Sequence, residues 1–106
     1  MSMWRIRDRR TFADLRARGR RHRCGPITVT ALLVDDGFPP RVAYAIGKSV
    51  GSAVVRNRVR RRLRAAMGEL APPCGAYLIA AGPTAASSSY PELKGSLATA
   101  LTATTT

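Results

Sequence analysis

The strongest constraint on the fold is a segment from about Ser52 to Leu70 whose hydrophobic pattern has a helical period. On a helical wheel its apolar residues fall within an arc of roughly 120°, which predicts an amphipathic helix with one face in the core. The apolar residues are Val55, Val59, Leu63, Ala66, Met67 and Leu70. The rest of the circumference carries Arg56, Arg58, Arg60, Arg61, Arg62 and Arg64. Two prolines, at 72 and 73, end the helix.

Two further helices are predicted near the ends of the chain. Residues 9–18 have an apolar pair three residues apart, with Thr11 as a candidate cap and Gly19 as a natural stop. Residues 90–101 have leucines spaced by four and begin beside a proline. The tail at 102–106 has no apolar stripe, so we expect it to be frayed.

Three segments have strand patterns. Residues 27–34 and 41–47 are rich in β-branched residues and flank the turn pair Asp36-Gly37, which predicts a β-hairpin. The uninterrupted apolar run at 74–81 predicts a buried central strand. The expected order is α-β-β-α-β-α in one α+β domain spanning residues 1–106, with residues 1–8 and 102–106 flexible.

Positive charge is concentrated in the first two thirds of the chain. The 106 residues include 18 Lys and Arg against 6 Asp and Glu, a formal net charge of +12. All of the basic residues except Lys48 and Lys94 are arginine, whose guanidinium binds phosphate bidentately and stacks on bases. Residues 1–64 carry a net charge of +13, and residues 65–106 carry −1. This distribution predicts a polyanionic partner.

Side chains for self-contained hydrolysis are scarce. His22 is the only histidine and has no partner at metal-ligand spacing, and Asp35 and Asp36 fit turn chemistry better than a carboxylate site. Cys24 and Cys74 match no metal spacing either. The sequence therefore predicts neither a catalytic residue nor a metal site on the protein. The chain start lacks a secretory signal pattern, and no apolar run reaches the ~18 residues of a membrane span, so a cytoplasmic location is expected.

The most informative motif covers residues 46–64. A turn of small and basic residues precedes the helix: Gly47, Lys48, Ser49, Gly51 and Ser52. Such a turn lets backbone N–H groups approach an anion. The helix then continues with Arg56-Asn57-Arg58 and further arginines. Over residues 47–61 this pattern resembles the protein subunit of bacterial ribonuclease P, and weaker agreement extends the resemblance over roughly residues 9–100.

The resemblance implies a two-layer α/β sandwich with a left-handed β-α-β crossover, against the usual right-handed preference. It implies the protein component of the ribonuclease P ribonucleoprotein, an endonuclease and hydrolase that removes the 5′ leader of precursor tRNA. The expected partners are the catalytic RNA subunit and precursor tRNA, with no membrane or DNA partner. The cleavage chemistry is expected in the RNA subunit with Mg²⁺, and no cofactor is expected on the protein.

Two sets of residues are expected to contact RNA. The set expected to bind the catalytic RNA is Lys48, Arg56, Asn57, Arg58, Arg60, Arg61 and Arg64. The set that the resemblance places in a leader-binding cleft, on the first-helix side of the sheet, is Phe12, Arg16 and Tyr44. Arg16 stands where relatives have a second aromatic. Core packing remains an alternative role for Phe12 and Tyr44.

Two other function classes are compatible with the charge. A structural RNA-binding protein, such as a ribosomal protein, has similar basicity. Membership of that class would explain the charge but not the motif at residues 47–61. A protein of anionic membrane surfaces is disfavoured, because the apolar face of the Arg-rich helix lacks Trp and Phe and is needed for the core.

Overall fold

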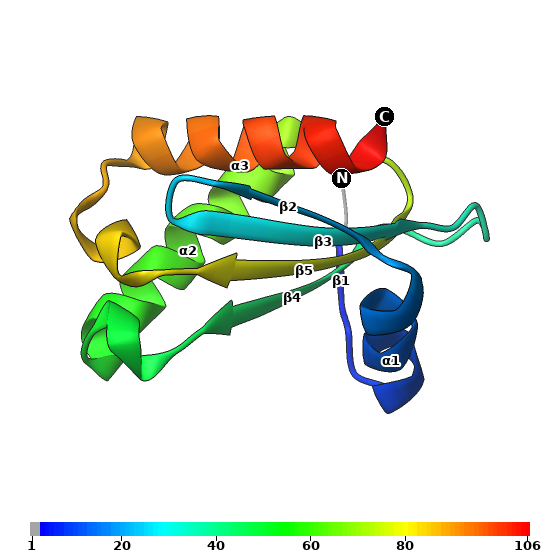
Figure 1. Cartoon of the computed structure of the whole chain (residues 1–106), viewed down its shortest axis with the longest axis horizontal. Coiled ribbons are helices and arrows are strands. Elements are labelled where there is room, and N and C mark those ends of the chain that lie inside the picture. The colour runs from blue at the N-terminus through cyan, green and yellow to red at the C-terminus, as the bar shows by residue number, and fades with distance from the viewer. Residues whose placement is uncertain (1–2) are drawn as a thin grey trace.

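The computed structural model describes residues 3–106, which form an α+β domain with a five-stranded mixed sheet (Figure 1). The helices of this part of the chain are α1 (Arg9–Arg18), α2 (Ala53–Leu70) and α3 (Tyr90–Thr105). The strands are β1 (Trp4–Arg5), β2 (Arg20–Cys24), β3 (Ile27–Leu33), β4 (Arg41–Ile46) and β5 (Gly75–Ala81). Two short 3-10 turns are η1 (Lys48–Val50) and η2 (Pro83–Ser87). The α+β class is confirmed.

The sheet has the strand order β1-β4-β5-β3-β2, with β5 parallel to β4 and antiparallel to β3. β5 is therefore the central strand that its apolar run predicts. The predicted hairpin is wrong, because β5 lies between β3 and β4. β5 is apolar on both faces, with Tyr77 and Ile79 toward one and Ala76 and Leu78 toward the other, so both faces of the sheet are covered at this strand.

Helix α2 connects the parallel neighbours β4 and β5. In Figure 1 both strands run from right to left, β5 lies above β4, and α2 passes behind the sheet. This arrangement is a left-handed crossover, as the family resemblance implies, and it departs from the hand that almost all such connections have.

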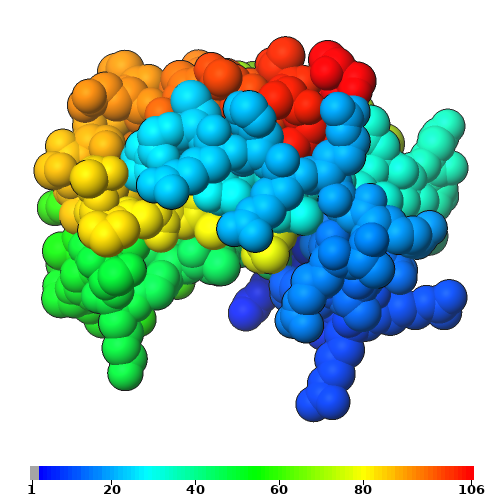
Figure 2. Space-filling model, viewed as in Figure 1, coloured from blue at the N-terminus to red at the C-terminus, as the bar shows by residue number. Residues whose placement is uncertain are grey.

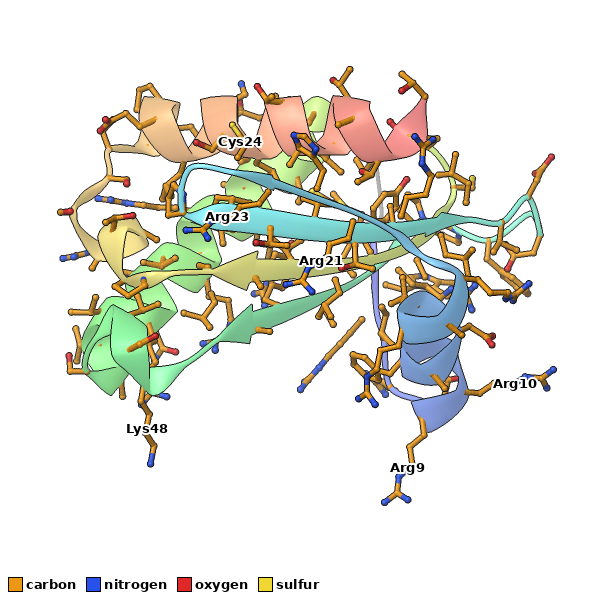
Figure 3. The ribbon with its side chains drawn as sticks, in the orientation of Figure 1. Arg9, Arg10, Arg21, Arg23, Cys24 and Lys48 are labelled. Carbon is orange, nitrogen blue, oxygen red and sulfur yellow. The ribbon has the colours of Figure 1, made fainter. Side chains whose placement is uncertain are left out.

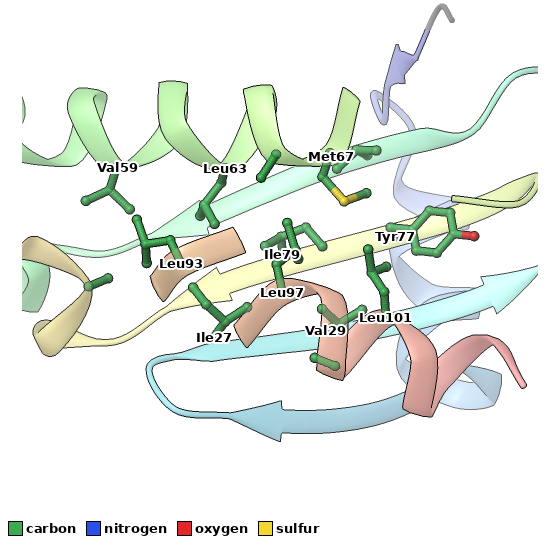
Figure 4. Packing of buried hydrophobic residues seen from close by; sticks show 14 of the residues in the cluster. Ile27, Val29, Val59, Leu63, Met67, Tyr77, Ile79, Leu93, Leu97 and Leu101 are labelled. Carbon is green, nitrogen blue, oxygen red and sulfur yellow. The ribbon is translucent and has the colours of Figure 1, made fainter. Parts of the chain in front are cut away.

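The main core lies between the sheet and the two long helices (Figure 4). Val59, Leu63, Ala66 and Met67 of α2 are fully buried, and Val55 and Leu70 pack at the border of the core. The helical wheel is thus confirmed. α3 adds fully buried leucines, and its buried side contacts both α2 and β3.

A smaller cluster on the other face of the sheet holds α1. Leu15 packs there with Ile6 and Ala76, and Phe12 lies at its margin. α1 has the predicted bounds, and the Gly19 N–H donates to the Leu15 carbonyl at its end. The predicted cap is wrong: Asp8 caps α1 and accepts from the backbone N–H of Thr11, which lies inside the helix.

The two ends of the described chain have more structure than the sequence predicts. Trp4–Arg5 pairs with β4 as the edge strand β1. α3 continues through the threonine-rich tail to Thr105, and Thr104 is only 2% exposed. Strand β2 is likewise absent from the predicted order. Within residues 3–106, no helix has the length and apolarity needed to cross a membrane.

Candidate nucleic-acid interface

The turn before α2 fixes the start of the Arg-rich helix. Val50 is buried and anchors η1, and Ser52 caps the helix by accepting from the Val55 N–H. Gly51 has φ of 146°, and a Cβ there would lie 3.1 Å from the Val55 side chain, so the position requires glycine. The turn leaves Lys48 exposed, and Figure 3 shows its side chain extending away from the body of the molecule.

The outer side of α2 presents basic groups to solvent. Asn57, Arg61 and Arg64 are exposed, and with Arg60 and Val54 they line a hollow of about 490 Å³. An Arg60 guanidinium N–H donates to the Asn57 Oδ1 at 2.7 Å, which aligns these two side chains. Val54 is 76% exposed, so this end of the helix is apolar as well as basic.

On the opposite flank of α2, two arginines form hydrogen bonds within the protein. Arg58 donates to the carbonyl of Ala86 and Arg62 to that of Ser88, each at 3.1 Å. Both guanidinium groups therefore hold the η2 segment against α2. Arg56 is also half-buried. The residues predicted to bind the catalytic RNA thus divide into an outward group and a group that packs against the protein.

This division predicts opposite results for two pairs of substitutions. Arg58→Ala with Arg62→Ala removes two half-buried charge-assisted hydrogen bonds, so we expect the free energy of unfolding to fall by about 1–3 kcal/mol. The matched variant, Arg60→Ala with Arg61→Ala, removes the same charge from the outer side and leaves stability nearly unchanged. Denaturant titration measures both. Equal destabilisation by the two pairs would contradict the assignment.

The face of the sheet that carries α1 forms a second basic surface. Strand pairing places Arg21 beside Thr30, and Arg23 beside Thr28, on this face. The two rows continue across the sheet as Leu78 with Ala43 and Ala80 with Ala45. α1 covers the other end of the face. Figure 3 shows both arginines in front of the sheet, and Figure 2 shows the surface hollowed between α1 and the η1 region.

Arg21 and Arg23 are functional candidates that sequence reasoning missed. Their segment, RRHRC, has no apolar alternation, so it carries no strand signal. The register with β3 is what places them on one face. A charged segment directly before a predicted strand, separated by only Gly25 and Pro26, is the one signal that indicates an edge strand here.

The three residues predicted for the cleft do not share one face. Arg16 is exposed on α1, and Phe12 is half-buried beside the small cluster. Tyr44 packs against the main core on the α2 side of the sheet. Phe12 and Tyr44 nevertheless line one pocket of about 610 Å³, which lies at the β1–β4 edge. We call it the edge pocket.

Tyr44 is held beside a cation. The guanidinium carbon of Arg64 lies 5.9 Å from the centre of the Tyr44 ring, which is cation–π distance. Burial raises the pKa of the Tyr44 hydroxyl, and the charge of Arg64 opposes that shift. The hydroxyl is therefore neutral near pH 7 and is a hydrogen-bond donor.

Potential metal ligands are dispersed over the described part of the chain. Within residues 3–106, no group of three or more His, Cys, Asp or Glu is placed to hold a metal ion. His22 is exposed, and Asp36 accepts from Arg41 and from the Phe38 N–H within its turn.

A small α+β domain with a net charge of +12, a long helix whose outer side is basic and a second Arg-bearing sheet face belongs to the nucleic-acid-binding class. A family model described as Ribonuclease P matches residues 2–105. The ribonuclease P protein component of Thermobifida fusca is 39% identical over 95% of this chain and 76% of that protein. The chain therefore belongs to the ribonuclease P protein family.

Two more comparisons define the extent of the similarity. The ribonuclease P protein component of Beutenbergia cavernae is 46% identical over 63 residues, which are 59% of this chain and about half (53%) of that relative. The solved ribonuclease P protein of Staphylococcus aureus superposes with a TM-score of 0.82 at 18% identity, covering 97% of this chain and 98% of that chain. The second match supports the fold.

Proposed function

We propose that this chain assembles with a catalytic RNA in the cytoplasm and promotes removal of the 5′ leader from precursor tRNA, by binding the two RNAs on different surfaces. The observation that carries this proposal is the separation of the outward side of α2 from the Arg-bearing α1 face of the sheet. The outward arginines of α2 and the arginines of β2 thus serve two different contacts.

The outward side of α2 binds the catalytic RNA in this proposal. The contact group is Lys48, Asn57, Arg60, Arg61 and Arg64, which are the predicted residues that do not hold η2 and are not packed like Arg56. Guanidinium groups along a helix of 18 residues suit the phosphates of a folded RNA. Asn57 adds an acceptor that can recognise a base edge or a 2′-hydroxyl.

The leader lies across the α1 face of the sheet. Phe12 and Arg16 of α1 offer an aromatic ring and a guanidinium group, and Arg21 and Arg23 of β2 offer two further guanidinium groups. Apart from Leu78, the side chains between them are alanine and threonine, so an extended strand can approach the sheet closely. Phosphate contacts therefore contribute more than stacking, which agrees with Arg16 in place of an aromatic. Tyr44 lies around the β4 edge from this face.

The cleavage chemistry belongs to the RNA partner. Residues 3–106 offer no carboxylate cluster fitted to Mg²⁺, so the metal acts with the catalytic RNA in this proposal and the protein contributes binding and charge neutralisation. Neutralised phosphates let the two RNAs approach each other at lower Mg²⁺.

The test is cleavage of precursor tRNA by the protein, by the catalytic RNA and by both together. We expect no cleavage by RNA-free protein. We expect the assembled particle to cleave faster than the RNA alone at low Mg²⁺ and to bind precursor more tightly than mature tRNA. Metal-dependent cleavage by the protein alone, or equal rates with and without protein, would refute the proposed function.

A further inference from the structure

The edge pocket joins the two surfaces proposed above, because it shares Arg60 and Arg64 with the outward side of α2 and Phe12 with the α1 face of the sheet, and it adds Trp4 and Tyr44. It opens at the border of the sheet, where β1 pairs with only Arg41 and Val42 of β4. Beyond Val42, the β1 side of β4 has no strand partner in residues 3–106. The pocket lies between α1 and α2, so it lies between the two RNA-binding surfaces.

The walls of the pocket combine aromatic rings with guanidinium groups. Its aromatic residues are Trp4, Phe12 and Tyr44, and its arginines are Arg5, Arg60 and Arg64. These are three of the chain's six aromatic residues, so aromatic side chains are concentrated at this border. No carboxylate is among the lining residues. An anionic and planar ligand therefore complements the pocket in both shape and charge.

Trp4 is positioned without being buried. Its backbone N–H donates to the Pro40 carbonyl at 2.8 Å, and its ring lies 5.4 Å from that of Phe38. The side chain is still 47% exposed. Backbone pairing thus fixes an aromatic side chain at the pocket while leaving ring surface free for a ligand.

Size favours a single nucleotide. The volume of about 610 Å³ falls within the range of small-ligand sites, roughly 300–1,000 Å³. Unpaired bases of single-stranded RNA are commonly bound by stacking on aromatic side chains or guanidinium planes. Arg64, already stacked near Tyr44, and Arg60, which faces both the pocket and the hollow on α2, are placed to bind the flanking phosphates.

We propose that the edge pocket binds one unstacked base of a single-stranded RNA segment, with Trp4 and Tyr44 as stacking walls and Arg60 and Arg64 as phosphate ligands. This inference rests on the proposed function, because the RNA is either the catalytic RNA or the precursor leader. The chemistry of the bound base is the same from both sources, and the experiment separates them.

Trp4 is the only tryptophan of the chain, so its fluorescence reports directly on the pocket. A base that stacks on the indole quenches it. We expect quenching when the catalytic RNA is added if the base comes from that RNA. We expect quenching of the assembled particle by precursor but not by mature tRNA if the base comes from the leader. RNA binding is followed in parallel by anisotropy of labelled RNA.

Substitutions identify the stacking residues. Trp4→Leu and Tyr44→Leu should each weaken binding of the quenching RNA about tenfold, which corresponds to about 1.4 kcal/mol within the range for one stacked base. Phe38→Leu is the matched control, because Phe38 contacts Trp4, is 49% exposed and does not line the pocket. Because Trp4 is half-exposed, we expect Trp4→Leu to keep the melting temperature of the unaltered protein.

Two results would overturn the pocket proposal while leaving the proposed function intact. One is unchanged Trp4 fluorescence in all arms although anisotropy shows RNA bound. The other is an equal loss of affinity in Phe38→Leu and Trp4→Leu, which would indicate an unspecific aromatic surface. Conversely, quenching without stimulated cleavage would support the pocket and refute the proposed function.

Discussion

Replacing Arg60 and Arg61 by alanine makes binding to the catalytic RNA weaker and less sensitive to salt. Each phosphate contact to single-stranded or duplex nucleic acid contributes roughly 0.7–0.9 to the slope of log affinity against log salt. Two lost contacts should therefore reduce the slope by about 1.4–1.8. At low salt, the affinity should fall by about one to two orders of magnitude. Filter binding or anisotropy over a salt series measures both quantities.

The control for this experiment removes the same charge elsewhere. Arg9 and Arg10 extend from α1 into solvent, away from α2 (Figure 3). The variant Arg9→Ala with Arg10→Ala has the same net charge as the α2 variant, and its salt slope should remain close to that of the unaltered protein. If the two variants lose equal slope, affinity depends on net charge alone and α2 is not the contact surface.

Replacing Leu63 by alanine should remove a large part of the stability of this domain. Leu63 is fully buried in the centre of the interface between α2 and the sheet (Figure 4). Removing its side chain costs transfer free energy and leaves a cavity, for a total of about 2–5 kcal/mol. Domains of this kind are stabilised by about 5–15 kcal/mol, so the loss is a substantial fraction.

An exposed apolar position near the start of the same helix provides the control. Val54 is 76% exposed, and alanine has the higher helix propensity, so Val54→Ala should leave the free energy of unfolding unchanged or slightly raised. Chemical denaturation of both variants separates core packing from helix propensity. A loss below about 1 kcal/mol for Leu63→Ala would contradict the packing described for α2.

Local patterns predicted the elements that have strong periodicity. α1 and α2 and the central strand β5 follow the apolar spacing of their residues to within one or two positions. The wheel of α2 also identified its buried residues, because a helix of 18 residues has room for one clear apolar face. These elements needed no information from distant parts of the chain.

Tertiary pairing decided the elements that sequence reasoning got wrong. The pairing of β3 with β4 was predicted from their closeness in sequence, but β5, which follows α2, inserts between them. β1 and β2 consist mostly of charged or exposed residues and become strands only by pairing with β4 and β3. The threonine-rich tail remains helical because Thr104 is buried against the rest of the domain.

The residue types of the candidate site could be predicted from the sequence, but the directions in which their side chains point could not. The arginines of α2 were identified by their density, yet the wheel does not show that Arg58 and Arg62 face η2, which lies more than 20 residues further along the chain. The alternation of β4 places Tyr44 on the same side of the sheet as Val42 and Ile46, which lie in the main core. Tyr44 therefore lies on the α2 face of the sheet, whereas the family resemblance places it in a cleft on the α1 face.

The edge strands of the sheet also affect the protein in the absence of RNA. An unpaired strand edge is a template for pairing with another copy of the same chain, and charges or very short strands prevent that pairing. β1 has only two residues, and β2 exposes Arg20, Arg21, His22 and Arg23 in succession. The shortness of β1 and the electrostatic repulsion between copies of β2 therefore disfavour edge-to-edge pairing. Any change that neutralises the charge of β2 would lower the colloidal solubility of the protein as well as its affinity for the ligand.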